Sequence, residues 1–303
     1  MDIGILGGSL GKGGYEAMVA DATQAADAGF HTFWLSQIVG QADAMTLLGA
    51  LGRDVPDIRF GTSVVPTYPR HPFVMAEQAR TVNALCDARF SLGVGLSHQP
   101  VVEGMWGVSF DKPLRHAREY LEALMPLIRG DDTRADGETI TARGQVTVGD
   151  PKLVPPVYLA ALGPQMLKLA GRMCDGTITW MTGAKTLATH TVPTITKAAD
   201  QVERPAPEIM AGFPMWVTDN VDHARERAAA VFEIYGQLPS YRAMLDREGL
   251  DGPADLAIVG NEETCAARVE ELREAGVTQL SGAIFADNAE DTARTGAFLA
   301  SLL

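Results

Sequence analysis

The sequence is poor in cysteine and contains no long hydrophobic run. Its 303 residues include only three cysteines, Cys86, Cys174 and Cys265, which lie far apart and form no C-x-x-C pair. So few thiols, in an odd number, argue against a disulfide framework and a zinc site. No apolar stretch approaches the roughly eighteen residues that a membrane span needs, and the first residues do not resemble a signal peptide. We therefore expect a cytoplasmic protein without a membrane partner.

Positive charge is also scarce. The chain has 25 Lys and Arg against 38 Asp and Glu, which gives a formal charge of -13. The basic residues form no cluster, and a diffuse negative field repels phosphate backbones, so we expect no nucleic-acid partner. An anionic small molecule would have to be held by backbone amides or by a few chosen cations.

Signatures of metal, nucleophilic and phosphoryl-transfer chemistry are missing. The six histidines are never paired at metal-ligand spacing, and there is no H-E-x-x-H, G-x-S-x-G or Walker sequence. We therefore predict no metal site. The difficult chemistry is expected to belong to a bound organic cofactor.

The pattern that the sequence does contain is an alternation of apolar strands with amphipathic helices. Eight such units follow one another without a linker, which predicts a single (β/α)₈ TIM-barrel domain over residues 1–303. A doubly wound open sheet is the alternative, but no G-x-G-x-x-G follows the first strand. The expected strands are 2–6, 31–36, 58–65, 90–95, 156–162, 175–180, 208–218 and 277–286.

Helices are expected between these strands, with one interruption. Asp43 is a predicted N-cap for a helix that runs through Ala50. The other predicted helices are 15–28, 72–87, 113–128, 164–174, 184–202, 221–250, 262–275 and one that begins at 289. Residues 131–149 are polar and alternating, and they predict a small β-hairpin insertion after the fourth unit.

The fourth strand and its end, FSLGVGLSHQP, raise a question. Gly93 and Gly95 lie on one face of the strand, and His98 follows at its C-terminal end. Two interpretations stay open: the glycines permit close packing of neighbouring strands, or they let a flat ligand approach the backbone. Likewise, Gly163 and Pro164 begin a helix at the barrel mouth, which either binds phosphate through free N–H groups or is a plain turn.

Three stretches of the chain resemble the luciferase-like family of flavin and deazaflavin oxidoreductases. They are YPRHPFVMAEQARTVNALCDARFSLGVGLSH, MLKLAGRMCDGTITW and IVGNEETCAARVEELREAGVTQL. With AADAGFHTFWLSQ near the start, the resemblance covers nearly the whole chain. The sequence ALGP before AGRMCDG is similar to the branch that uses coenzyme F-420 (8-hydroxy-5-deazaflavin). Flavin mononucleotide (FMN) is the alternative cofactor.

The resemblance implies roles for particular positions at the ends of strands. It implies a non-prolyl cis peptide at Ser63–Val64 behind the cofactor ring, and His98 as the acid–base group. It further implies cofactor contacts at Gly7, Ser36, Gly95, Leu96, Ser97 and His98, and phosphate contacts at Ala161, Leu162 and Gly163. A second phosphate or ribityl contact is implied at Thr182 and Gly183. The chain departs from the family where Ser36–Gln37 replaces an Asp–His pair and where His98 replaces a glutamate.

The resemblance therefore implies an F-420-dependent oxidoreductase, a homodimer, that moves a hydride to or from a small carbonyl, imine or activated alkene. Two alternatives are an FMN-dependent monooxygenase and a non-catalytic cofactor-binding protein. For the pairs 105–106 and 180–181 two interpretations stay open: they form apolar walls for the substrate, or they pack under the loops. Tyr241 and Arg242 are expected on a solvated helix face, although either could reach an anionic tail.

Overall fold

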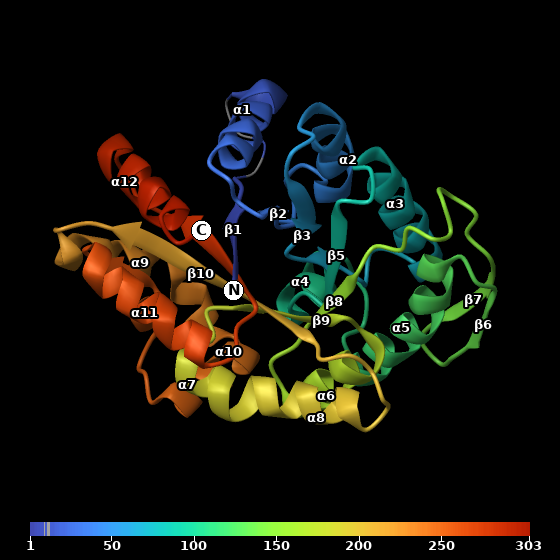
Figure 1. Cartoon of the computed structure of the whole chain (residues 1–303). Coiled ribbons are helices and arrows are strands. Elements are labelled where there is room, and N and C mark those ends of the chain that lie inside the picture. The colour runs from blue at the N-terminus through green and yellow to red at the C-terminus, as the bar shows by residue number, and fades with distance from the viewer. Residues whose placement is uncertain (9, 11–12) are drawn as a thin grey trace.

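The predicted strands pair in parallel and close into a barrel (Figure 1). The computed structural model describes residues 1–8, 10 and 13–303. The last barrel strand pairs with both the first strand and β10, which completes the circle and confirms the (β/α)₈ fold. The barrel strands are β1 (Asp2–Leu6), β2 (Thr32–Leu35), β3 (Arg59–Thr62), β5 (Phe90–Gly95), β8 (Val157–Ala160), β9 (Gly176–Trp180), β10 (Glu208–Val217) and β12 (Gln279–Ile284).

Two short strands were not expected from the sequence. β4 (Val65–Pro66) pairs with β5 after a break at Ser63–Val64, where the peptide bond is cis as the resemblance implied. β11 (Ile258–Gly260) pairs with the C-terminal end of β10. Both lie at the C-terminal side of the barrel, so they shape its mouth.

Helices surround the barrel, and most agree with the predictions (Figure 1). The Asp43 side chain accepts from the Thr46 N–H at 2.9 Å, as expected of an N-cap, although that helix continues past Ala50 to Asp54. The helices are α1 (Gly14–Asp27), α2 (Ala44–Asp54), α3 (Pro72–Leu85), α4 (Gln99–Gly104), α5 (Pro113–Arg129), α6 (Pro164–Met173), α7 (Ala184–Thr186), α8 (Val192–Asp200), α9 (Val221–Gln237), α10 (Pro239–Glu248), α11 (Glu262–Glu274) and α12 (Ala289–Ala300).

Three local features differ from the predictions. The helix expected over 221–250 breaks at Leu238, because Pro239 lacks an N–H and instead occupies the first turn of a separate helix, α10. The helix expected over 184–202 contains a π-helical stretch, Leu187–Thr191. The short helix α4 was missed altogether.

The insertion after the fourth unit is the predicted β-hairpin. β6 (Thr133–Asp136) and β7 (Thr141–Gly144) pair in antiparallel register. Within the described residues, no helix is both long and apolar enough to cross a bilayer. The three cysteines are buried and free.

The glycines of β5 make room for packing inside the barrel. A Cβ added at Gly93 would lie 2.0 Å from the Thr62 carbonyl oxygen, and one at Gly95 would lie 2.7 Å from Val64 Cγ2. Thr62 also binds the Gly93 backbone twice, because its Oγ1 lies 2.8 Å from both the N–H and the carbonyl. The packing interpretation therefore holds for both glycines, since protein atoms already fill the space beside them.

Candidate functional site at the barrel mouth

The predicted site residues all lie at the C-terminal end of the barrel, where parallel strands bring side chains from distant segments together. This placement follows from the closed sheet and does not itself assign their roles. They are Gly7 after β1, Ser36 after β2, Ser63 and Val64 after β3, Gly95 to His98 at the end of β5, Ala161 to Gly163 after β8, and Thr182 and Gly183 after β9.

The segment around the cis peptide forms the floor of the mouth. The Ser36 hydroxyl donates to the Ser63 carbonyl at 2.6 Å, which ties the end of β2 to the break after β3. Val64 is half-buried and packs on the barrel-filling cluster of Trp34, Tyr158, Ile178 and Met210. The floor is therefore apolar, and packed side chains beneath it hold it in place.

His98 lies at the edge of the mouth, at the start of α4. Ser97 has a left-handed φ of 64°, and the His98 carbonyl accepts from the N–H groups of Val101 and Val102. The His98 side chain makes no capping bond. Burial lowers the pKa of His98 from its ordinary value of 6.5, because desolvation disfavours the charged imidazole. The ring is therefore mainly neutral at pH 7.

Three aromatic residues that the sequence did not single out as one feature form a wall beside His98. The Tyr241 ring meets the His98 ring edge-on, with centroids 5.9 Å apart, and lies 4.9 Å from the Tyr235 ring. Tyr235 in turn lies 6.3 Å from Trp180 at the end of β9. The prediction that Tyr241 lies on a solvated helix face is thus wrong. Pro239 was the signal in the sequence that could have predicted this contact, because the proline ends α9 and gives α10 a new direction.

The other residues predicted to contact the substrate or the cofactor tail differ in their surroundings. Trp180 lies in this aromatic wall, whereas Met181 is buried in the core cluster on which Trp180 and Tyr235 pack, and Met105 is 63% exposed. The Arg242 guanidinium donates to the carbonyls of Leu250 and Asp251. Arg242 therefore stabilises the residues that follow its own helix, and its guanidinium is not placed to bind the anionic tail of a cofactor.

The start of α6 fits an anionic group. Gly163 has an extended backbone (φ -76°, ψ 153°), and no described side chain caps this helix. A Cβ at Gly163 would meet nothing within 4 Å, so the approach is open. The preceding carbonyl of Leu162 is bound by His190 Nε2 at 2.9 Å, which fixes the turn. The N–H groups of this first turn can bind phosphate without any positive side chain.

The start of α7 is different, because a side chain of the protein already occupies it. Glu248 Oε1 accepts from the Thr186 N–H at 2.5 Å. Thr182 is fully buried, and its hydroxyl faces the Trp180 carbonyl at 3.4 Å. Of the two turns predicted to contact the cofactor, the start of α6 is therefore the open one and the turn at Thr182 and Gly183 the occupied one. In the part of the chain that the structure describes, no group of three acidic, histidine or cysteine residues could hold a metal ion.

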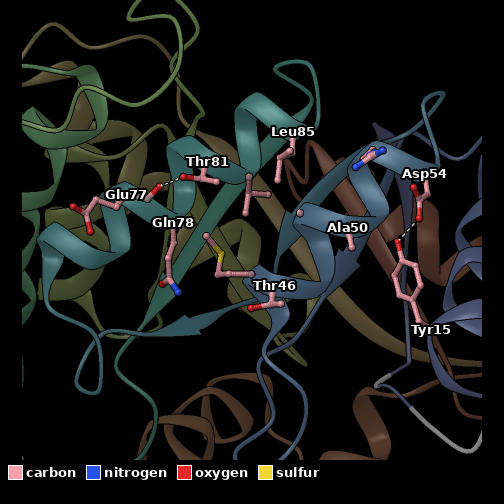
Figure 2. Close-up of a pocket in the computed structure, with 12 residues that line it drawn as sticks. Tyr15, Thr46, Ala50, Asp54, Glu77, Gln78, Thr81 and Leu85 are labelled. Atoms are coloured by element: carbon pink, nitrogen blue, oxygen red, sulfur yellow. Dashed lines mark hydrogen bonds between the residues drawn. The ribbon is translucent and has the colours of Figure 1, made fainter.

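A separate hollow lies on the outer surface, away from the mouth. It has a volume of about 610 Å³ and lies among α1, α2 and α3 (Figure 2). Tyr15 closes one side through a 2.8 Å hydrogen bond from its hydroxyl to Asp54. None of the predicted cofactor residues lines this hollow.

Comparison with known proteins gives matches along most of the chain. The model of the luciferase-like monooxygenase family matches residues 4–279. A 5,10-methylenetetrahydromethanopterin reductase from Methanolobus tindarius is 26% identical over 283 residues, which cover 83% of this chain and 85% of the relative. An F420-dependent glucose-6-phosphate dehydrogenase from Beutenbergia cavernae is 33% identical over 187 residues, covering 60% and 55%.

A solved structure has the same fold. The coenzyme F420-dependent tetrahydromethanopterin reductase from Methanopyrus kandleri superposes with a TM-score of 0.78 at 22% identity. The superposition covers 93% of this chain and 92% of that one.

The contact between His98 and Tyr241 generates a first prediction. Because desolvation alone lowers the His98 pKa, Tyr241→Ala should admit water and raise that pKa toward 6.5. An NMR titration of the histidine ring signals measures the change. Tyr68→Leu is the matched control, since its ring stacks on His116 at 4.0 Å and should leave His98 unaffected. A His98 midpoint that stays in place in Tyr241→Ala contradicts the assignment.

Proposed function

The chain belongs to the luciferase-like monooxygenase family, and from that premise we propose that it is a coenzyme F-420-dependent oxidoreductase acting on a small organic substrate. Similar proteins named as F420-dependent support the choice of a deazaflavin over FMN. The observation that carries the proposal in this chain is the free start of α6 at the barrel mouth. It gives an acidic protein an uncharged means of binding an anionic cofactor.

The residues of the mouth fit such a cofactor in two places. The apolar floor at Val64, tied down by the bond from Ser36 to Ser63, offers a flat support for a tricyclic ring. The first turn of α6 after Gly163 offers N–H donors for the phosphate. When bound there, a deazaflavin supplies a carbon atom that accepts or gives a hydride.

His98 is the proposed catalytic residue for the proton. Its neutral ring can accept a proton from a substrate hydroxyl or amine while the substrate carbon loses a hydride. In the opposite direction, the protonated ring returns that proton to the oxygen or nitrogen of a carbonyl or imine. The wall of Tyr241, Tyr235 and Trp180 beside it limits water. The protein thus contributes positioning and proton transfer, and the hydride chemistry belongs to the cofactor.

Cofactor binding is tested at Gly163. Gly163→Asp places a carboxylate at the N-cap, where it should keep or raise the free energy of unfolding by about 0.5 kcal/mol. The same negative charge should weaken deazaflavin binding by about tenfold or more. Gly163→Ser caps the helix without charge and should weaken binding much less. Fluorescence titration with F-420 and with FMN gives the affinities.

Two outcomes would overturn this assignment. If purified protein binds FMN tightly and F-420 not at all, the chain is an FMN-dependent enzyme. If Gly163→Asp binds F-420 as well as the wild type does, the phosphate does not lie at the start of α6.

The role of His98 predicts a pH dependence. Because its pKa is lowered, the ring is neutral above pH 6.5, so the rate of substrate oxidation should be constant there and fall as acid protonates the ring. His98→Gln should reduce kcat by about a hundredfold and remove the acid limb. Stopped-flow rates of hydride transfer across pH measure both. An unchanged profile in His98→Gln would exclude the residue as the proton acceptor, while unchanged cofactor affinity confirms that the site is intact.

We also propose that the hollow among α1, α2 and α3 is where a second copy of the chain docks (Figure 2). α2 and α3 run side by side, since an added Cβ at Gly49 would lie 3.3 Å from Leu85. Leu85 lines the hollow and is 45% exposed. Arg53 at the end of α2 and Glu77 near the start of α3 also line the hollow, so a two-fold contact there has charges of both signs available for pairing.

The dimer proposal predicts that Ala50→Glu disrupts association. Ala50 lines the hollow, and a carboxylate there would be desolvated against its symmetry copy. Sedimentation analysis should show a dimer for the wild type and a monomer for Ala50→Glu. Ala188→Glu, on an exposed residue of the π-helical stretch, should remain dimeric. A wild-type chain that is monomeric at micromolar concentration contradicts the proposal.

A further inference from the structure

We propose that Glu248 is a specificity-determining residue that fills an anion position at the substrate edge of the mouth, so that the site takes uncharged substrates and rejects phosphorylated ones. The inference rests on the proposed function, because it concerns the substrate of that same site. It begins from the start of α7, where a carboxylate of the chain stands in the place of a ligand.

The carboxyl group of Glu248 fits closely against this turn. Its Oε1 accepts from the Thr186 N–H at 2.5 Å. A Cβ added at Gly183 would lie 2.4 Å from Glu248 Cδ, so the missing side chain of Gly183 leaves room for the carboxyl group in this conformation. The turn and the glutamate are therefore matched in shape as well as in charge.

Two further polar groups belong to the same turn. Lys185 belongs to the same turn, and its Nζ lies 3.5 Å from the Glu248 carbonyl oxygen. The Thr186 hydroxyl is fully buried and, among the described residues, has no hydrogen-bond partner. A lysine, a backbone N–H and a hydroxyl are donors typical of phosphate binding. In this chain an internal carboxylate satisfies the backbone donor instead.

Glu248 also lies on the face of α10 that carries Tyr241. Tyr241 and Glu248 are seven residues apart, which is two helical turns, so they share one face with Leu245. Tyr241 contacts His98, and Glu248 contacts the turn after β9. α10 lies next to α7 in the fold (Figure 1). One helix therefore covers the edge of the mouth from the proposed proton acceptor to the filled anion position.

Two effects then work against a phosphorylated substrate. The Thr186 N–H already has an acceptor, so an arriving phosphate finds one donor fewer. The carboxylate also repels a second negative charge placed within a few ångströms of it. The remaining wall consists of Tyr241, Tyr235 and Trp180, which favour an apolar body. The substrate class that fits is an uncharged, apolar carbonyl compound or the matching alcohol.

The test removes the carboxylate and asks whether phosphate binding appears. The parent protein in this test is the Gly163→Asp variant, and every other variant also carries that substitution so that the start of α6 does not bind phosphate. No cofactor is added. Inorganic phosphate is titrated by calorimetry. Glu248→Gln should bind phosphate at least about tenfold more tightly than the parent does, because one repelling charge is gone and the N–H is released. Adding Lys185→Ala to Glu248→Gln should abolish the gain.

Two further variants control for charge and folding. Glu233→Gln removes one exposed carboxylate from α9 and should leave phosphate binding unchanged. Glu248→Asp keeps the negative charge on a shorter side chain and should still reject phosphate. The proposal is overturned if the parent already binds phosphate as tightly as Glu248→Gln does, or if the gain survives Lys185→Ala.

An activity measurement separates this inference from the proposed function. In the otherwise wild-type protein saturated with F-420, phosphate should inhibit turnover of an uncharged ketone or alcohol in Glu248→Gln at least tenfold more strongly than in wild type. If F-420 does not bind at all, the proposed function fails, while the calorimetric result with phosphate still decides the role of Glu248.

Discussion

The closure of the sheet is the constraint on which the rest of the site depends. Because β12 pairs with both β1 and β10, the carboxyl ends of all the barrel strands meet at one rim. In a chain of net charge -13, backbone N–H groups at helix starts offer an anion donors that require no basic side chain. Of the two helix starts after β8 and β9, the first is open, whereas the carboxylate of Glu248 occupies the second.

The parts of the fold that sequence could predict are those governed by local chemistry. Alternating apolar segments gave the order of strands, Asp43 was visible as an N-cap, and turn-rich polar residues gave the hairpin. The family resemblance supplied the cis bond at Ser63–Val64. The site residues it named share one rim, but their roles are still predictions, because placement alone does not show what they bind.

What could not be predicted depends on contacts between distant segments. Glu248 reaches Thr186 across 62 positions, and Tyr241 reaches His98 across the mouth. Neither contact leaves a periodic trace in the sequence, and the charged character of residues 239–249 suggested a solvated face instead. The sequence likewise could not distinguish a packing role of Gly93 from a ligand-binding role, because the Thr62 backbone that lies beside it belongs to another strand. Burial of His98, and with it the lowered pKa, follows from the same long-range packing.

The close approach of Thr62 to Gly93 has a consequence for how substrate choice could change in such a protein. The middle of the barrel has no space for a larger side chain at that point, since main-chain atoms block it. The α9–α10 segment, by contrast, lies outside the barrel strands and packs on the rim through a second hydrophobic cluster, in which Phe232 and Leu245 lie with Met181 and Trp216. Changes of substrate specificity are therefore expected from substitutions in that segment, at positions such as Tyr241 and Glu248. The packing of side chains between the barrel strands can stay unchanged.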